Sequence, residues 1–244
     1  MDVLQLGPLR VRQMAKTSGT PLKNADATPL TVVLMYGYGA PGDDLVSLAG
    51  VIEAPAGTRF VFPEAPSLLG AGGMFEMGDA RAWWDIDVGR FQRAMMRGTI
   101  DEVMDEVPAG MSAATESVVA MLDALEQESK ITGERIVLGG FSQGSMLALD
   151  VALRTKRPLA GLALLSSTLL AKHEWVPLMG ARSGLKTFQS HGTQDPILPY
   201  GIAERLRHAL VDGGLEVSFM SFDGGHGIPP QVMRDLGQWL RSLA

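Results

Sequence analysis

Short, continuously apolar segments recur along this chain and constrain its fold more than any other feature. They occupy residues 30–36, 58–62, 134–140, 159–166, 186–191 and 216–222. A strand with one solvent-exposed face alternates apolar and polar side chains. Most of these segments are apolar throughout, so we expect strands that are buried on both faces. Stretches with helical spacing lie between them, such as Leu45, Leu48 and Ile52. This alternation predicts an α/β fold with a mostly parallel central sheet and helices on both faces.

Two regions depart from the alternation. The first 27 residues carry leucines at 4, 6 and 9 in loose alternation, interrupted by Gly7 and Pro8, which predicts an antiparallel hairpin at the sheet edge. Residues 63–112 are rich in glycine, methionine and aromatic residues and are too long for an ordinary connection. We expect a small cap-like excursion there, beside a site.

Composition limits the class of protein. Of 244 residues, 46% are hydrophobic, and no shift in composition marks a boundary, so we expect a single domain over residues 1–244. Lysine and arginine total 21 against 27 acidic residues, a net charge of -6. No basic field is therefore available for a nucleic-acid partner, and the charge favours a soluble ester over packed anionic lipid as substrate.

From these residues we also expect no segment that directs the chain into or across a membrane. No apolar run reaches the roughly 18 residues of a membrane span, so we expect no integral membrane association. The early Asp2 and the absence of an apolar signal core favour a cytoplasmic location. With no cysteine there is no disulfide framework or thiolate site. The sequence leaves open whether the protein forms a homodimer.

The sharpest chemical motif is the pentapeptide Gly140-Phe141-Ser142-Gln143-Gly144. It directly follows an apolar strand-like segment and precedes a helix-like one, which is the setting of a nucleophile elbow. Flanking glycines suit this turn because it strains the serine backbone and leaves no room for neighbouring side chains. We interpret Ser142 as a nucleophile; the alternative is an ordinary serine in a glycine-rich turn.

A serine nucleophile needs a general base, and His226 is the best candidate among four histidines. It lies in a glycine-rich loop after the last expected strand, where it can swing over the sheet edge to Ser142. His173 and His208 lie in a polar connection and on an expected helix, and His191 precedes the acid candidate, the wrong order for a base. The alternative for His226 is a residue chosen for turn geometry.

The acid that orients the base is expected between Ser142 and His226 in sequence. Asp195 is favoured because it follows the end of an expected strand, at the edge where ligand sites of parallel sheets collect. Asp223 is the rival, since it lies three residues before His226. Asp150 would sit two turns down the elbow helix and point away. Capping of the turn at Pro196 is the alternative role of Asp195.

Acyl transfer also requires backbone N–H groups at the position where the oxyanion forms. Gln143, the residue after the nucleophile, supplies one in this architecture. The glycine-rich segment 35–44 follows an early strand, and we select the N–H of Tyr38 as the second donor. The alternative is a βα turn capped by Asp43.

Together these residues resemble the phospholipase/carboxylesterase family of α/β hydrolases, which includes acyl-protein thioesterases and small bacterial carboxylesterases. The resemblance covers residues 30 to 242 and rests on PEAP at 63–66, AWWDID at 82–87, GGFSQGS at 139–145, HGTQDPILPY at 191–200 and GGHGIPP at 224–230. It implies an α/β-hydrolase fold, the triad Ser142, Asp195 and His226, oxyanion donors Tyr38 and Gln143, and no metal or organic cofactor. The family usually has His-Gly where this chain has Tyr36-Gly37.

These observations favour a serine carboxylesterase that cleaves esters of small to medium acyl chains through an acyl-enzyme. The alternatives are acyl-protein thioesterase or lysophospholipase activity and, in a different class, a ligand-binding receptor on a hydrolase fold. Four side chains of the excursion are candidates to line an apolar acyl channel, with core or cap packing as their alternative role: Met74, Met77, Trp83 and Trp84.

Overall fold

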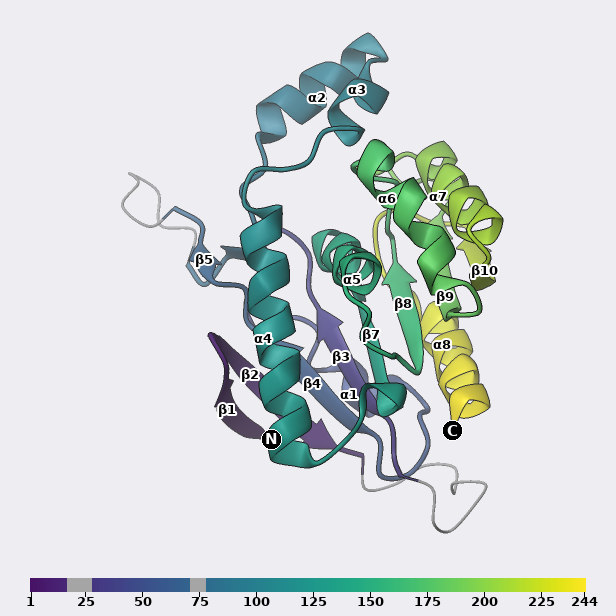
Figure 1. Ribbon diagram of the computed structural model, residues 1–244. Helices are drawn as coiled ribbons and strands as arrows, with labels where there is room; N and C mark the ends of the chain where they lie inside the picture. The colour runs from purple at the N-terminus through teal and green to yellow at the C-terminus, as the bar shows by residue number, and fades with distance from the viewer. Residues whose placement is uncertain (17–27, 71–77) are drawn as a thin grey trace.

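A computed structural model describes residues 1–16, 28–70 and 78–244. It contains an eight-stranded sheet (Figure 1) with the strand order β1-β2-β4-β3-β7-β8-β9-β10. These strands are β1 (Asp2–Leu6), β2 (Leu9–Ala15), β3 (Thr31–Met35), β4 (Arg59–Pro63), β7 (Ile136–Phe141), β8 (Gly161–Leu165), β9 (Lys186–Gly192) and β10 (Glu216–Phe222). Every apolar segment singled out in the sequence forms one of them.

The sheet is parallel except at one edge. β1 pairs with β2 and β2 with β4 in antiparallel fashion, and every pair from β4 through β3 to β10 is parallel. All residues of β3 and β8 are buried. The predictions of an α/β fold with a mostly parallel sheet and of an N-terminal edge hairpin are confirmed.

Helices cover both faces of the sheet. They are α1 (Leu48–Val51), α2 (Val88–Arg97), α3 (Ile100–Met104), α4 (Met111–Ser129), α5 (Gln143–Arg154), α6 (Lys172–Met179), α7 (Tyr200–Asp212) and α8 (Pro230–Leu243). Neighbouring residues of β9 face opposite ways: the Phe188 ring packs on Trp239 of α8, and the Gln189 amide donates to the Ala203 carbonyl of α7 at 2.9 Å. The two faces thus pack against different helices.

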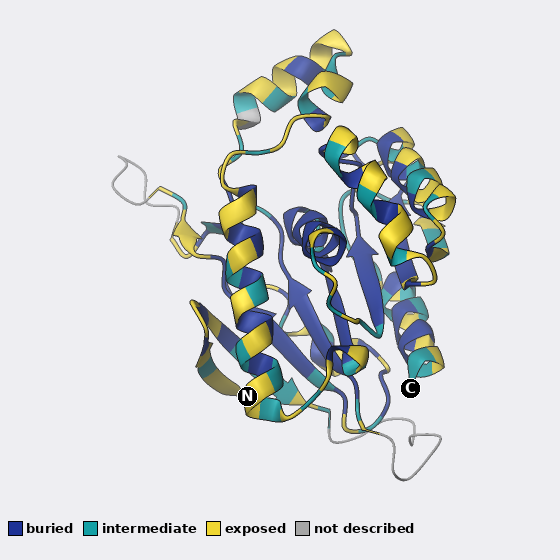
Figure 2. Cartoon of the chain, viewed as in Figure 1, coloured by how far each residue is buried: buried dark blue, intermediate teal, exposed yellow. Residues whose placement is uncertain are grey.

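The central strands and the helix faces turned toward them consist of buried residues (Figure 2). One buried carboxylate, Asp150 of α5, links three helices. It accepts hydrogen bonds from Thr115 of α4 at 2.6 Å and from the Trp175 indole of α6 at 2.8 Å, and it pairs with Arg154. Because all these donors belong to the helical layer, Asp150 points away from the sheet edge that carries Ser142.

The described residues between β4 and α4 extend beyond the carboxyl ends of the parallel strands. They contain a small hairpin, β5 (Ser67–Leu68) with β6 (Arg81–Ala82), followed by α2 and α3, which project past the carboxyl ends of the strands (Figure 1). Arg205 of α7 donates to Asp101 of α3 at 2.8 Å, and the Ala171 N–H donates to the Met104 carbonyl at 2.8 Å. These contacts fasten α3 over α6 and α7.

Candidate active site

Ser142 occupies a strained turn between β7 and α5. Its φ is 52° and its ψ is -120°, a conformation that costs a residue with a side chain about 1–3 kcal/mol. The surrounding chain holds it there, because the Ser142 N–H donates to the Leu165 carbonyl at 2.9 Å and its carbonyl accepts from the Ser145 N–H at 3.0 Å. The turn has the strand, strained serine and helix expected of a nucleophile elbow.

The glycines on either side of Ser142 are required by close packing against β3. A Cβ on Gly140 would lie 2.4 Å from the Met35 carbonyl oxygen, and a Cβ on Gly144 would lie 2.1 Å from the same atom. No side chain fits at either position without movement of the strand. The backbone of β3 therefore sets the position of Ser142.

We expect Gly144→Ala to lower the free energy of unfolding by about 3 kcal/mol, because the added methyl group overlaps β3. Gly201→Ala is the matched control: it also changes the second residue of a helix, but nothing lies within 4 Å of its Cβ position. It should be neutral or stabilise by about 0.5 kcal/mol through helix propensity. Urea unfolding of both variants checks this, and equal stability of the two would contradict the packing argument.

Asp195 and His226 come together after β9 and β10. His226 Nδ1 lies 2.7 Å from Asp195 Oδ2, and Asp195 Oδ1 accepts the N–H groups of Ile197 and Leu198, each at 2.9 Å. Burial alone would raise the pKa of Asp195, but these donors outweigh it and hold the pKa below its ordinary value. The carboxylate is thus ionised, and its orientation is fixed by the backbone.

The rival acid has a different partner. Asp223 Oδ1 accepts from the side-chain amide of Gln194 at 2.5 Å. The same segment holds the histidine loop in place, because the Gln194 N–H donates to the Gly224 carbonyl at 2.9 Å. Between the two candidates, the geometry pairs Asp195 with His226 and leaves Asp223 to support the loop.

His191 lies beside Asp195 and is fully buried. Its Nε2 is 2.8 Å from the Leu198 carbonyl oxygen and 3.3 Å from Asp195 Oδ2. Burial lowers the pKa of this imidazole, so it stays neutral next to the carboxylate. The sequence order excluded His191 as a base but gave no sign of this contact with Asp195.

Phe141, the residue before Ser142, contacts His226. The Phe141 ring packs on the His226 imidazole with centroids 4.8 Å apart. Across residues 1–16, 28–70 and 78–244, no hydrogen bond joins Ser142 to His226. Catalytic hydrogen bonds are often long in unliganded sites and tighten when substrate binds.

The predicted oxyanion loop lies directly against Ser142. A Cβ on Gly37 would lie 3.1 Å from the Ser142 Cβ. In the part of the chain that the structure describes, the backbone N–H groups of Tyr38 and Gln143 donate to no other group. Both predicted donors are thus available to a ligand.

Tyr36, which departs from the family pattern, points into the protein. The side chain is buried, and its hydroxyl oxygen accepts the Ala65 N–H at 2.7 Å. Burial raises the pKa of this phenol to about 12, so it is neutral. Tyr36 therefore links the end of β3 to the segment after β4.

A second set of contacts supports the predicted oxyanion loop and centres on Glu64. The sequence did not predict a role for this residue. This buried carboxylate accepts from Arg12, and it lies within 3.5 Å of Arg10 and 3.8 Å of Arg81. Arg12 Nη1 also donates to the Gly42 carbonyl at 3.0 Å and so connects β2 to the loop. The only sequence signal was a lone glutamate after an apolar strand, in the PEAP segment.

The four predicted substrate-binding residues fall into two groups. Met74 and Met77 lie outside the described residues. Trp83 and Trp84 are buried, and both contribute backbone groups to the Gln143 side chain: the Trp83 N–H donates to Oε1 at 3.0 Å, and the Trp84 carbonyl accepts from Nε2 at 2.8 Å. These contacts join residues 83 and 84 of the excursion to the elbow.

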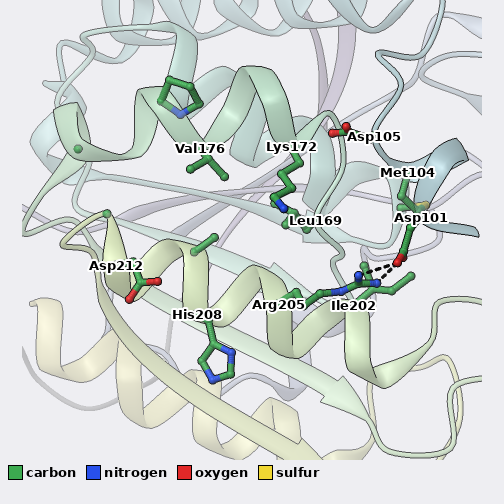
Figure 3. A pocket seen from close by; sticks show the side chains of 14 residues that line it. Asp101, Met104, Asp105, Leu169, Lys172, Val176, Ile202, Arg205, His208 and Asp212 are labelled. Atoms are coloured by element: carbon green, nitrogen blue, oxygen red, sulfur yellow. Dashed lines mark hydrogen bonds and ion pairs between the residues drawn. The ribbon is translucent and has the colours of Figure 1, made fainter.

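A cavity of about 740 Å³ lies between α3, α6 and α7 (Figure 3). The Arg205 and Asp101 side chains meet at one end of it, and Leu169, Val176 and Ile202 contribute apolar surface. The predicted triad, the oxyanion donors, Trp83 and Trp84 are absent from its lining. The cavity therefore adds no support to the predicted acyl channel.

Within the described residues, no helix is both long and apolar enough to cross a membrane. The same residues contain no group of three or more histidine, cysteine or carboxylate side chains arranged to hold a metal ion.

Comparison with known proteins identifies the family. The phospholipase/carboxylesterase family model matches residues 22–244, which is most of the chain. The chain belongs to this family. It is therefore an α/β hydrolase that acts on ester bonds, as the sequence predicted.

Two sequence relatives and one solved structure resemble the chain over most of its length. Acyl-protein thioesterase 1 of Cryptococcus neoformans var. neoformans serotype D is 28% identical over 242 residues, covering 91% of this chain and 97% of that protein. Acyl-protein thioesterase 1 of Mycosarcoma maydis is 29% identical over 226 residues, covering 87% and 90%. The crystal structure of esterase PE8 has the same fold, with a TM-score of 0.74, 24% identity, and coverage of 97% and 99%.

Proposed function

We propose that the chain is a serine carboxylesterase that hydrolyses esters of small to medium acyl chains through an acyl-enzyme on Ser142. The observation that carries this proposal is the 2.7 Å contact of His226 Nδ1 with Asp195 Oδ2, at the sheet edge that also carries the strained serine. An ionised carboxylate only accepts, so Nδ1 keeps the proton. The lone pair of Nε2 is then free to act as a base.

Acylation begins when Ser142 Oγ attacks the ester carbonyl carbon and His226 Nε2 takes the hydroxyl proton. The carbonyl oxygen becomes an oxyanion, which the N–H groups of Tyr38 and Gln143 stabilise; each such donor contributes about 3 kcal/mol. When the tetrahedral intermediate collapses, the bond to the leaving oxygen breaks and that oxygen receives the proton from His226. The alcohol leaves, and the acyl group stays on Ser142.

Deacylation repeats these steps with water. His226 takes a proton from water, and the hydroxide oxygen adds to the acyl carbon. Collapse breaks the bond to Ser142 Oγ, which regains its proton from His226, and the carboxylic acid is released. Asp195 stays ionised throughout and stabilises the imidazolium that forms twice in each cycle. Its lowered pKa suits this role.

The backbone strain at Ser142 supports a nucleophilic role, because a nucleophile at a strand end needs this turn to expose its oxygen. A receptor on the same fold would keep this turn, so turnover decides between the two readings. The Cβ clashes at Gly140 and Gly144 indicate that the surrounding packing is specific to this turn.

Thioester hydrolysis is the second candidate, and the names of the relatives favour it. Two relatives at 28% and 29% identity are acyl-protein thioesterases. The chemistry proposed above applies equally to a thioester, with a thiol as the leaving group. Lysophospholipid is a further ester that the same catalytic residues would accept if the predicted acyl channel admits a long chain.

The test is hydrolysis of p-nitrophenyl esters from acetyl to palmitoyl, of acyl thioesters with matching chains, and of a lysophospholipid. We expect turnover of the esters with an optimum at short to medium chains and lower kcat/KM for the thioesters. A preference for palmitoyl thioester would favour the second candidate. No turnover, together with stabilisation of the protein by an unreacted ester, would favour a receptor.

A further inference from the structure

The two proposed oxyanion donors come from separate parts of the fold. Tyr38 lies in the loop after β3, and Gln143 is the first residue of α5. Their N–H groups must converge on one oxygen, and an error of a few tenths of an ångström weakens such charge-assisted hydrogen bonds. Pairing of β3 with β7 and the close packing of Gly140 and Gly144 place the elbow beside the end of β3. Tyr38 lies three residues beyond that end, so a further contact is needed to hold the loop itself against the elbow.

Trp83 makes that contact with two different donors. Its indole Nε1–H donates to the Tyr36 carbonyl at 3.0 Å, at the start of the oxyanion loop. Its backbone N–H donates to the side-chain Oε1 of Gln143 at 3.0 Å. Trp83 is only 2% exposed and Gln143 only 1%. Since both bonds are shielded from water, losing either leaves a buried carbonyl oxygen without a partner.

Neighbouring contacts make this bridge rigid. The Tyr36 ring packs on the Trp83 ring with centroids 5.8 Å apart, and its hydroxyl is held by the Ala65 N–H. On the other side, the Gln143 Nε2–H donates to the Trp84 carbonyl at 2.8 Å, so the amide is fixed at both ends. The bridge is thus buried and fully hydrogen-bonded, with little freedom to shift.

We propose that Trp83 is a positioning residue that sets the separation of the two oxyanion donors, Tyr38 and Gln143, by bridging the Tyr36 carbonyl and the Gln143 side chain. This inference rests on the proposed esterase function. It gives Trp83 a role in stabilising the transition state, separate from contact with the acyl chain.

The test compares Trp83→Phe with Trp175→Phe in the full chain. Both substitutions remove a buried indole N–H, but the Trp175 indole donates to Asp150 at 2.8 Å, outside the proposed site. Active sites are counted by fluorophosphonate titration, so that unfolded protein does not enter kcat. We expect Trp83→Phe to lower kcat about 10- to 100-fold with KM within about twofold of wild type, because the hole binds the transition state. Trp175→Phe should keep wild-type kcat even if its melting temperature falls equally.

A second readout separates the oxyanion hole from general stability. An alkyl trifluoromethyl ketone adds to the nucleophilic serine, and the resulting adduct carries the oxyanion. Its inhibition constant should rise for Trp83→Phe by the factor by which kcat/KM falls, and should not change for Trp175→Phe. If Trp83→Phe does not fold, Gln143→Met breaks the other half of the bridge and keeps the backbone N–H; the same losses are expected.

The inference is overturned if Trp83→Phe matches Trp175→Phe in kcat and in ketone affinity. If only Gln143→Met folds, the inference is overturned when that variant keeps the kcat and the ketone affinity of the wild type. That outcome leaves the proposed function intact as long as the wild type turns over esters. Failure of the proposed function itself would appear in the wild type, as absent turnover or absent fluorophosphonate labelling of Ser142.

Discussion

Ser142→Ala is expected to lower kcat for ester hydrolysis by about 10⁶-fold, because without the nucleophile the remaining site only binds and polarises the substrate. The variant should fold as the wild type does. Alanine keeps the Cβ, and the contacts that hold the turn are made by the Ser142 backbone, at Leu165 and Ser145. Steady-state kinetics and circular dichroism of the purified variant test both statements.

Ser117→Ala is a suitable control for Ser142→Ala. Ser117 is a partly exposed residue of α4, and its hydroxyl donates to the Ala113 carbonyl of the same helix at 2.8 Å. This variant should keep wild-type kcat. If Ser142→Ala retained more than about a hundredth of wild-type kcat, a different group would have to be the nucleophile.

His226→Ala is expected to lower kcat by a comparable factor, about 10⁴- to 10⁶-fold, since the serine then lacks its base. Residues that act as one unit are not additive, so the double variant with Ser142→Ala should be no slower than Ser142→Ala alone. His208→Ala, at an exposed position of α7, should leave kcat unchanged. Near-normal turnover by His226→Ala would contradict its role as base.

The acid can be assigned in the same experiment. Asp195→Asn should lower kcat about 10⁴-fold, because an amide in this position favours the wrong tautomer of His226. Asp223→Asn should keep kcat within a few-fold of wild type, since its observed partner is Gln194. A larger loss at Asp223 than at Asp195 would reverse the assignment.

Much of the fold was predictable because the signals are local. Segments such as 30–36 and 159–166 are apolar throughout, and burial on both faces follows from that pattern alone. The elbow was also visible, since Gly140 and Gly144 flank a serine between a strand and a helix. The carboxyl-end position of Asp195 followed from strand order.

The supports of the site were not predictable, because they join residues that are distant in sequence and depend on side-chain geometry. Glu64 meets Arg12 across the antiparallel pair β2 and β4, and Trp83 reaches both Tyr36 and Gln143. The segment after Asp44 has helical spacing, yet its helix α1 has only four residues. Spacing identifies an apolar face but not how many turns tertiary packing retains.

The most direct test of the account is to identify the acylated residue during turnover. Wild-type protein is mixed with a slowly hydrolysed p-nitrophenyl ester, quenched in acid within the first turnovers, and mapped by mass spectrometry after proteolysis. The account predicts one acyl group per molecule, on the peptide that contains Ser142, together with an equivalent burst of p-nitrophenol. Turnover with an acyl group on another residue, or with no covalent adduct and no burst, would contradict it.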